Sequence, residues 1–382
     1  MLLALKLALA ADIYDNQNRI KESDTVKVIK PKKCRKKIYR NYENICQNLS
    51  DDEFYDRLQI HKSTFDYIFK NIENGLKRSK NRTEVSPREI LQITLEYLIT
   101  GGSMLRISQT QKLNRRFVPK LIERVCKVIY DKLGPLHMPK FEKKDWERIS
   151  NEYYQRFGFP HCLGSIDIKK LQVKASTCFD LETFLFGIVD PSFKFIYSDL
   201  ITFNKVTDEK LFQNCKFFRD LEDDALNIPE PDNLPKSNLA TPYVFLGNEN
   251  LELTKYILTP YPGDMINQEE SNFNLRFAKS KLCSQYTFGM LLNKFKVLTT
   301  NFAVSISKVT NIVKAIMTLH NVILDLEGCT MNDAVQFSNE KFVDPANIDI
   351  LDEEALRIRD IYKYYFNFID IDDNVDLVSI IL

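Results

Sequence analysis

Two polar positions interrupt apolar segments where a metal ion could be held. Asp167 stands between Ile166 and Ile168, so on an extended strand its carboxylate points to the face opposite both isoleucines. A later apolar segment ends in the polar cluster Asn248–Asn250. Carboxylate and amide oxygens are ligands that hard cations prefer. These residue types therefore favour metal chemistry, provided that the fold brings them together.

Gln285 is a third position of this kind. Its segment has apolar residues at spacings of three and four, which predicts a helix whose sheet-facing stripe contains Ala278, Leu282, Gln285, Phe288, Leu292 and Phe295. Simpler interpretations also fit these residues. Asp167 could be a solvated residue on an amphipathic strand, and Gln285 could be a core residue whose hydrogen bonds are satisfied.

The cysteines and histidines favour neither disulfide nor zinc chemistry. The chain has 8 cysteines scattered without a C-x-x-C pair, a pattern typical of reduced thiols in a cytosolic or nuclear protein. It has only 4 histidines, none of them paired at zinc-ligand spacing. We therefore expect no zinc site built from these residue types.

The charge of the chain is small in total but unevenly distributed. Net charge is +1, so attraction to nucleic acid must come from local clusters. The stretch Lys27–Arg40 has eight bases and no acid, whereas residues 330–382 hold twelve acids and four bases. A nuclear-import signal or a phosphate-contacting arm fits the first cluster best, with a solvated linker as the alternative. The predicted nuclear signal consists of six of these bases, Lys30, Lys32, Lys33, Arg35, Lys36 and Lys37.

The elements that would position these residues can be read from periodicity. Apolar spacing predicts helices between Asp51 and Trp146, one of them begun by Ser86 as N-cap and Pro87 in its first turn. Strands are expected at Cys162–Val173, Thr183–Val189, Lys194–Ile201 and Tyr243–Gly247, and helices at 205–218, 271–297 and 305–326. This order predicts an α+β or mixed α/β fold.

Met1–Ala11 is better explained as a short amphipathic helix than as a signal peptide, and no membrane span is expected.

The helical region contains a candidate DNA-binding surface. Helices at Leu91–Leu98, Leu105–Gln111 and Asn114–Leu133, with a tight break at Gly101–Ser103, resemble a helix-turn-helix. The last helix carries five bases that could contact phosphates or base edges, namely Arg115, Arg116, Lys120, Arg124 and Lys127. An ordinary helical bundle with a charged outer face is the alternative. Pro119 is expected to kink or break this helix.

An ordered set of short motifs resembles the Harbinger-type (PIF) DDE transposases and their domesticated nuclease-like relatives. Gly164–Asp167 resembles the family's G-A-I-D strand, and Leu185–Phe195 resembles its next hairpin. Further matches follow in the family's order at Thr207–Asp208, Leu234–Pro235, Pro242–Gly247, Leu258–Pro260, Phe273–Arg276, Phe288–Gly289 and Leu319–Asn321. Each motif is weak alone, but together they cover about residues 54–326.

The resemblance implies an RNase H-like fold in which three carboxylates hold two magnesium ions. Carried over residue by residue, these catalytic positions fall on Asp167, Asn248 and Gln285, of which only Asp167 is an acid and a metal ligand. Loss of about two negative charges should weaken binding of a divalent cation by several kcal/mol. Rescue by Glu249 would need a bulge, because adjacent strand residues face opposite sides. Lys169 and Lys170 add cations beside the remaining acid.

The expected organisation has four parts. Residues 1–50 form a basic, disordered arm with the nuclear-signal-like cluster, and 51–146 a helical, helix-turn-helix-like domain. Residues 147–330 form the RNase H-like DDE nuclease domain, and 331–382 an acidic helical tail. The resemblance implies a nuclear protein, with the cytoplasm as a second compartment, whose partners are DNA and a Myb-like DNA-binding protein.

Three functional hypotheses remain at this point. The first is a cleavage-deficient, domesticated protein that acts by binding DNA or protein. The second is an active endonuclease or transposase that uses Asp167 with substituted ligands and a divalent metal, Mg or Mn. The third is a decaying element without a selected function. Whether the chain is an enzyme is therefore left open.

Overall fold

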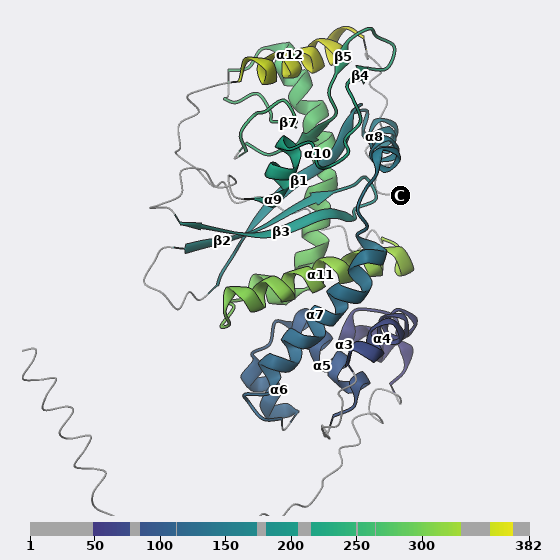
Figure 1. Ribbon diagram of the computed structural model, residues 1–382, viewed down its shortest axis with the longest axis vertical. Coiled ribbons are helices and arrows are strands. Elements are labelled where there is room, and N and C mark those ends of the chain that lie inside the picture. The colour runs from purple at the N-terminus through teal and green to yellow at the C-terminus, as the bar shows by residue number, and fades with distance from the viewer. Residues whose placement is uncertain are drawn as a thin grey trace, which may run out of the picture. The chain divides into compact units, whose positions relative to one another are not determined.

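The structure of the protein is a computed structural model (Figure 1). It describes residues 49–76, 85–111, 113–173, 181–204, 215–249, 251–263, 265–329 and 352–369. Contacts divide the chain into a unit of residues 1–40 and a unit of residues 41–382, and all described residues belong to the second. The basic cluster between Lys30 and Lys37 and almost all of the arm predicted at 1–50 therefore lie outside the described residues.

The first part of the described chain is helical. It contains α3 (Asp51–Leu58), α4 (Lys62–Leu76), α5 (Pro87–Thr100), α6 (Met104–Thr110) and α7 (Val118–His137). Helix α5 begins as predicted, because Ser86 caps it and Pro87 occupies its first turn. It ends at Gly101, whose φ of 65° is a left-handed conformation that glycine adopts without strain.

The prediction that Pro119 breaks the last of these helices is wrong. Helix α7 begins at Val118, so Pro119 lies in the first turn, where its missing N–H removes no helical hydrogen bond. The chain before it, which includes Arg115 and Arg116, is a turn and not a helix.

The second part of the chain is built on a five-stranded mixed sheet. Its strands are β1 (Cys162–Leu171), β2 (Leu181–Val189), β3 (Phe195–Asn204), β6 (Val244–Leu246) and β7 (Ile257–Leu258), arranged in the order β3-β2-β1-β6-β7. Strands β1, β2 and β3 pair antiparallel, whereas β6 pairs parallel to both β1 and β7. Seven consecutive residues of β1 are buried, which is typical of a central strand.

Small elements connect β3 to β6. Helix α9 spans Lys216–Glu222, so it overlaps only the end of the helix predicted at 205–218, most of which lies outside the described residues. A two-stranded sheet follows, formed by β4 (Asp232–Asn233) and β5 (Ala240–Thr241).

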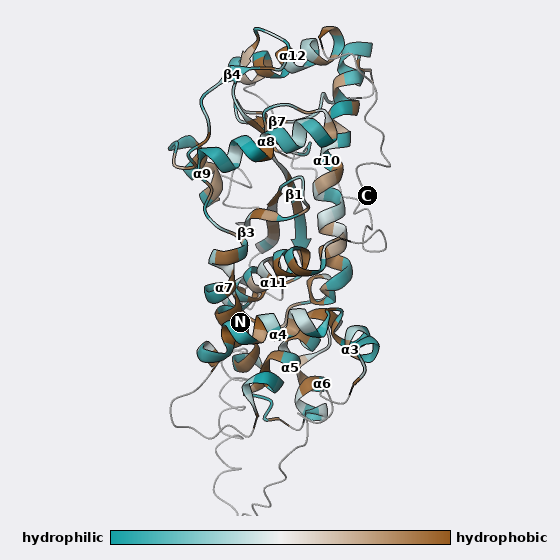
Figure 2. Ribbon diagram, turned by 90° about the vertical axis from the view of Figure 1, so that its right-hand side faces the viewer, coloured by the Kyte–Doolittle hydropathy of each residue, from teal (hydrophilic) through white to brown (hydrophobic). Residues whose placement is uncertain are grey.

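Helices pack against the sheet. Helix α10 (Gln268–Lys294) runs along it, followed by η1 (Lys296–Thr299), and α12 (Glu353–Phe368) packs against α10 (Figure 1). Helix α8 (Lys143–Phe157) contacts β1 and is largely hydrophilic in Figure 2, because only a stripe that includes Trp146, Tyr153 and Phe157 is buried. The boundary predicted between residues 146 and 147 falls in its first turn.

Helix α11 (Ile306–Glu327) joins the helical part to the sheet. By length and composition it could cross a membrane, but 67% of its apolar window is buried inside the protein. It packs against α7 and β3, as the core helix of a globular protein does. Strands followed by packed helices confirm the mixed α/β fold predicted from the sequence.

Candidate functional site

Asp167 lies in the centre of the sheet and is completely buried, with an exposed fraction of 0%. Its interpretation as a solvated residue of an amphipathic strand is therefore wrong. Strand β1 pairs parallel to β6 with Ser165 opposite Leu246. Asp167 and Asn248 each follow this last pair of the register by two residues. The topology thus places two of the three predicted site positions on neighbouring chain segments.

Helix α10 covers Asp167 with a serine. The Ser284 hydroxyl donates to Asp167 Oδ2 at 2.6 Å, and it accepts a hydrogen bond from the Ser165 hydroxyl, whose oxygen is 2.7 Å away. All three side chains are buried. Because water cannot solvate a buried carboxylate, such hydrogen bonds are needed to stabilise its charge.

The same helix supplies a cation. Lys281 Nζ lies 3.4 Å from Asp167 Oδ2 and donates a hydrogen bond to the carbonyl oxygen of Ile166. The lysine side chain is 5% exposed, so the pair is shielded from solvent. Burial lowers the pKa of Lys281, and the neighbouring Asp167 carboxylate opposes that shift. The positive charge facing Asp167 therefore comes from the chain itself.

The sequence prediction missed Lys281 because its stripe departs from the buried face in the first half of α10, although Phe288, Leu292 and Phe295 are buried as predicted. Ala278 is exposed and Leu282 half-buried, whereas the buried face includes Phe273, Phe277, Lys281, Ser284, Phe288 and Leu291. Serines on this face allow the helix to approach the sheet closely, and an apolar pattern cannot identify them. The sequence nevertheless contains a signal for the burial of Lys281, since this residue follows Phe273 and Phe277 at a spacing of four and so lies on the same side of the helix.

The other two predicted catalytic positions lie at the margin of this arrangement. Gln285 follows Lys281 by four residues, so both lie on the same side of α10, but Gln285 is only half-buried. Asn248 is half-buried two residues after the end of β6, and Glu249 is exposed. Lys170 forms its ion pair with Glu182, on the neighbouring strand, and Lys281 rather than Lys170 faces Asp167.

These residues do not fit a divalent metal. Magnesium needs several anionic oxygens, but Asp167 is the only acid at the three positions and already faces the Lys281 ammonium. Within the described part of the chain, no group of three or more His, Cys, Asp or Glu side chains could hold a metal ion. The arrangement is a buried ion pair in which Ser284 links the Asp167 carboxylate to Ser165.

The five basic residues of the predicted DNA-binding surface separate into two groups. Arg115, Arg116, Lys120 and Lys127 are exposed, and the two lysines lie on one side of α7 because they are seven residues apart. Arg124 is half-buried and donates to the carbonyl oxygens of Gly75 and Leu76, at 3.0 and 2.8 Å. It therefore caps the end of α4.

Comparisons with known proteins agree with this fold. Residues 183–321, from β2 to α11, match a family described as DDE superfamily endonuclease. The chain is also 22% identical over 302 residues to "Protein ALP1-like" of Arabidopsis thaliana, an alignment that covers 73% of this chain and 72% of the relative. No solved structure matches the chain significantly. Endonucleases of this superfamily usually use a divalent metal, and they act on DNA.

Proposed function

We propose that this chain, a Harbinger transposase-derived member of the DDE endonuclease superfamily with an RNase H-like fold, has lost strand cleavage and acts in the nucleus by binding DNA or protein. The observation that carries the proposal is the buried pair of Lys281 and Asp167. A lysine ammonium takes the place that a metal cation would need beside the only acid of the site.

Electrostatics explains why this pair opposes metal binding. An incoming cation would be repelled by Lys281, and moving the ammonium away would leave a buried charge without its partner, which is strongly unfavourable. Asn248 and Gln285 contribute only neutral amide oxygens. Without a metal-activated nucleophile, in-line phosphoryl transfer loses most of its acceleration.

A cleavage assay tests the loss of activity directly. The full chain is incubated with plasmid DNA and Mg²⁺ or Mn²⁺, beside the triple variant Lys281→Met, Asn248→Asp and Gln285→Glu. We expect no cleavage by the natural chain. Metal-dependent cleavage by the natural chain that disappears with Asp167→Ala would contradict the proposal and favour an active endonuclease with substituted ligands.

DNA binding is proposed for the exposed bases at the start of α7. Phosphate contacts release counterions, so each contact contributes a slope of about −0.9 to the logarithmic salt dependence of affinity. We expect the triple variant Arg115→Gln, Arg116→Gln and Lys120→Gln to lose two to three phosphate contacts. Its slope should therefore be less negative by about 0.9 for each lost contact, as measured by fluorescence anisotropy with duplex DNA. Arg124→Gln is the matched control, and an unchanged slope in the triple variant would exclude this surface.

Nuclear import and a Myb-like partner complete the proposal. The Lys30–Lys37 cluster suits an import signal, and family resemblance suggests that the helical region, 51–146, receives a Myb-like DNA-binding protein. A fluorescent fusion in which the six bases are replaced by alanine should stay in the cytoplasm. Nuclear pull-downs that recover no Myb-like protein with the full chain would count against the partner.

A further inference from the structure

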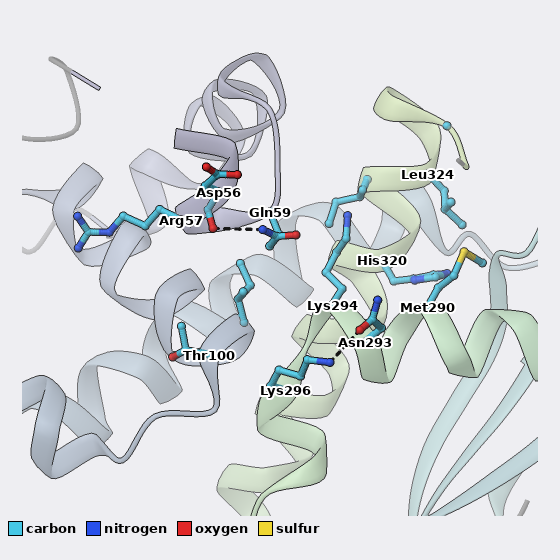
Figure 3. Close-up of a pocket in the computed structure, with 13 residues that line it drawn as sticks. Asp56, Arg57, Gln59, Thr100, Met290, Asn293, Lys294, Lys296, His320 and Leu324 are labelled. Carbon is cyan, nitrogen blue, oxygen red and sulfur yellow. Dashed lines mark hydrogen bonds between the residues drawn. The ribbon is translucent and has the colours of Figure 1, made fainter. Parts of the chain in front are cut away.

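A pocket lies apart from the Asp167 site, where α3 and the end of α5 meet the end of α10 and α11 (Figure 3). Its volume is about 320 Å³, within the usual range for ligand sites. The apolar lining consists of Ile99, Met290, Ile323 and Leu324. Aliphatic and thioether side chains thus offer a surface for an apolar group of modest size.

A buried hydrogen-bond acceptor also lines this pocket. His320 is 5% exposed, and its Nε2 lies 2.9 Å from the carbonyl oxygen of Phe193. Because a carbonyl can only accept, Nε2 carries the proton and Nδ1 is an acceptor. Among the described residues no group donates to Nδ1. A ligand in the pocket can therefore satisfy this atom with an N–H or O–H group.

The rim is cationic. Lys296 Nζ donates to the neutral side chain of Asn293 at 2.8 Å, and Lys294 has no ion-pair partner within the described ranges. Arg57 is neutralised by Glu96 at 3.0 Å. The Asp56 carboxylate lies on the α3 side, away from both lysines in Figure 3. Two uncompensated ammonium groups therefore stand above an apolar floor.

We propose that this pocket binds an acidic peptide segment with aliphatic side chains. An aliphatic side chain would rest on Met290 and Ile323, a carboxylate would lie between Lys294 and Lys296, and a backbone N–H would donate to His320 Nδ1. A peptide combines these three groups within a few bonds. The pocket thus binds a protein partner independently of the Asp167 site.

Nucleic acid fits this pocket less well. No Phe, Tyr or Trp is among the lining residues, so a base would find none of these rings on which to stack. Phosphate oxygens are acceptors only, so a phosphate bound between the two lysines would leave the acceptor Nδ1 of His320 without a donor. Both mismatches favour a peptide over a nucleotide.

Fluorescence anisotropy with the full chain tests the proposal. The probe is a fluorescein-labelled Leu-Asp-Leu-Asp-Leu peptide, and Ser-Asp-Ser-Asp-Ser tests the apolar floor at equal charge. The double variant Lys294→Gln and Lys296→Gln should raise the Kd of the first peptide about tenfold or more, since it removes two charge-assisted contacts. Its matched control is Lys255→Gln with Lys279→Gln, which removes two lysines outside the pocket.

A second variant tests the cavity rather than the charge. Leu324→Trp fills the apolar floor and should abolish binding while the melting temperature stays near that of the natural chain. If this variant does not fold, the lysine variant still tests the proposal, because its two substitutions lie at the rim of the pocket and not in the apolar floor. The proposal would be overturned if both variants bound the peptide as tightly as the natural chain does. It would also be overturned if the natural chain did not bind the peptide at millimolar concentration, or if equimolar single-stranded DNA displaced the peptide.

Discussion

Lys281 and Asp167 face each other in the interior of the protein, and the contribution of each side chain to stability depends on the presence of the other. The carboxylate accepts a hydrogen bond from Ser284, and the ammonium donates to the Ile166 carbonyl. Pairing and hydrogen bonding together offset the cost of removing two charges from water. Removal of either partner alone should therefore cost far more than removal of both.

This reasoning predicts the effect of Lys281→Met. The substitution keeps the side-chain volume but leaves Asp167 charged and buried, so it should reduce the free energy of unfolding by about 3–5 kcal/mol. The double variant with Asp167→Asn should recover most of the loss. Urea unfolding measures both, with Lys279→Met on the same helix as the control. Equal losses in the single and double variants would show that the pair is not coupled.

Two other buried groups give opposite dependences of stability on pH. Burial lowers the pKa of His320 to about 4, below its ordinary 6.5. Its contribution to stability is therefore present above pH 6.5 and is lost as pH falls toward 4. Burial raises the pKa of Asp190 from 3.8 to about 6, so its contribution is present below pH 3.8 and is lost as pH rises through 6. The two effects largely cancel in the natural chain.

Asp190→Asn should expose the uncompensated effect of His320. Relative to the natural chain, the variant should gain about 3 kcal/mol of unfolding free energy between pH 4 and 7, because the raised pKa of Asp190 no longer opposes folding. Urea unfolding at several pH values measures the difference. If the two stability curves run parallel over this range, the opposing effect of Asp190 is absent.

Among the helices, α11 links the helical part to the sheet, and its Asn321 side chain hydrogen-bonds to both parts. Asn321 donates to the carbonyl oxygens of His137 in α7 and Phe195 in β3, and its Oδ1 accepts from the Phe195 N–H. The distances are between 2.8 and 2.9 Å, and Asn321 is buried. Three buried backbone groups from two elements thus depend on one amide.

Asn321→Ala should reduce the free energy of unfolding by about 3 kcal/mol or more, because it leaves these buried groups unsatisfied. Asn311→Ala, at a half-buried position of the same helix, should change it by less than about 1 kcal/mol. Thermal and urea unfolding of both variants provide the comparison. Equal effects of the two substitutions would show that the three hydrogen bonds do not stabilise this junction.

The elements with strong local signals could be predicted from the sequence. Ser86 and Pro87 marked the start of α5, and apolar segments marked β1, β2 and β3, because capping and burial act over a few residues. The register of α10 could not be predicted in this way. Apolar periodicity treats a lysine as exposed, whereas Lys281 is buried by a partner 114 residues earlier in the chain.

Across the whole molecule, the same limit applies to the charged residues. Five bases near the start of α7 were indistinguishable by sequence, yet Arg124 binds the end of α4 and the other four are exposed. Contacts between residues far apart in the sequence determine which basic side chains stabilise the fold and which remain exposed for binding. The two binding surfaces proposed here, the exposed bases and the pocket at Lys294, both depend on that distinction.

The central claim is the proposal that the Lys281 ammonium occupies the place that a metal ion would need beside Asp167. Calorimetric titration of Mg²⁺ and Mn²⁺ into the natural chain, Asp167→Ala and the Lys281→Met, Asn248→Asp, Gln285→Glu variant tests it most directly. We predict heat of binding only for the triple variant, since it alone has three acids and no internal cation. Metal binding by the natural chain that Asp167→Ala abolishes would contradict the claim.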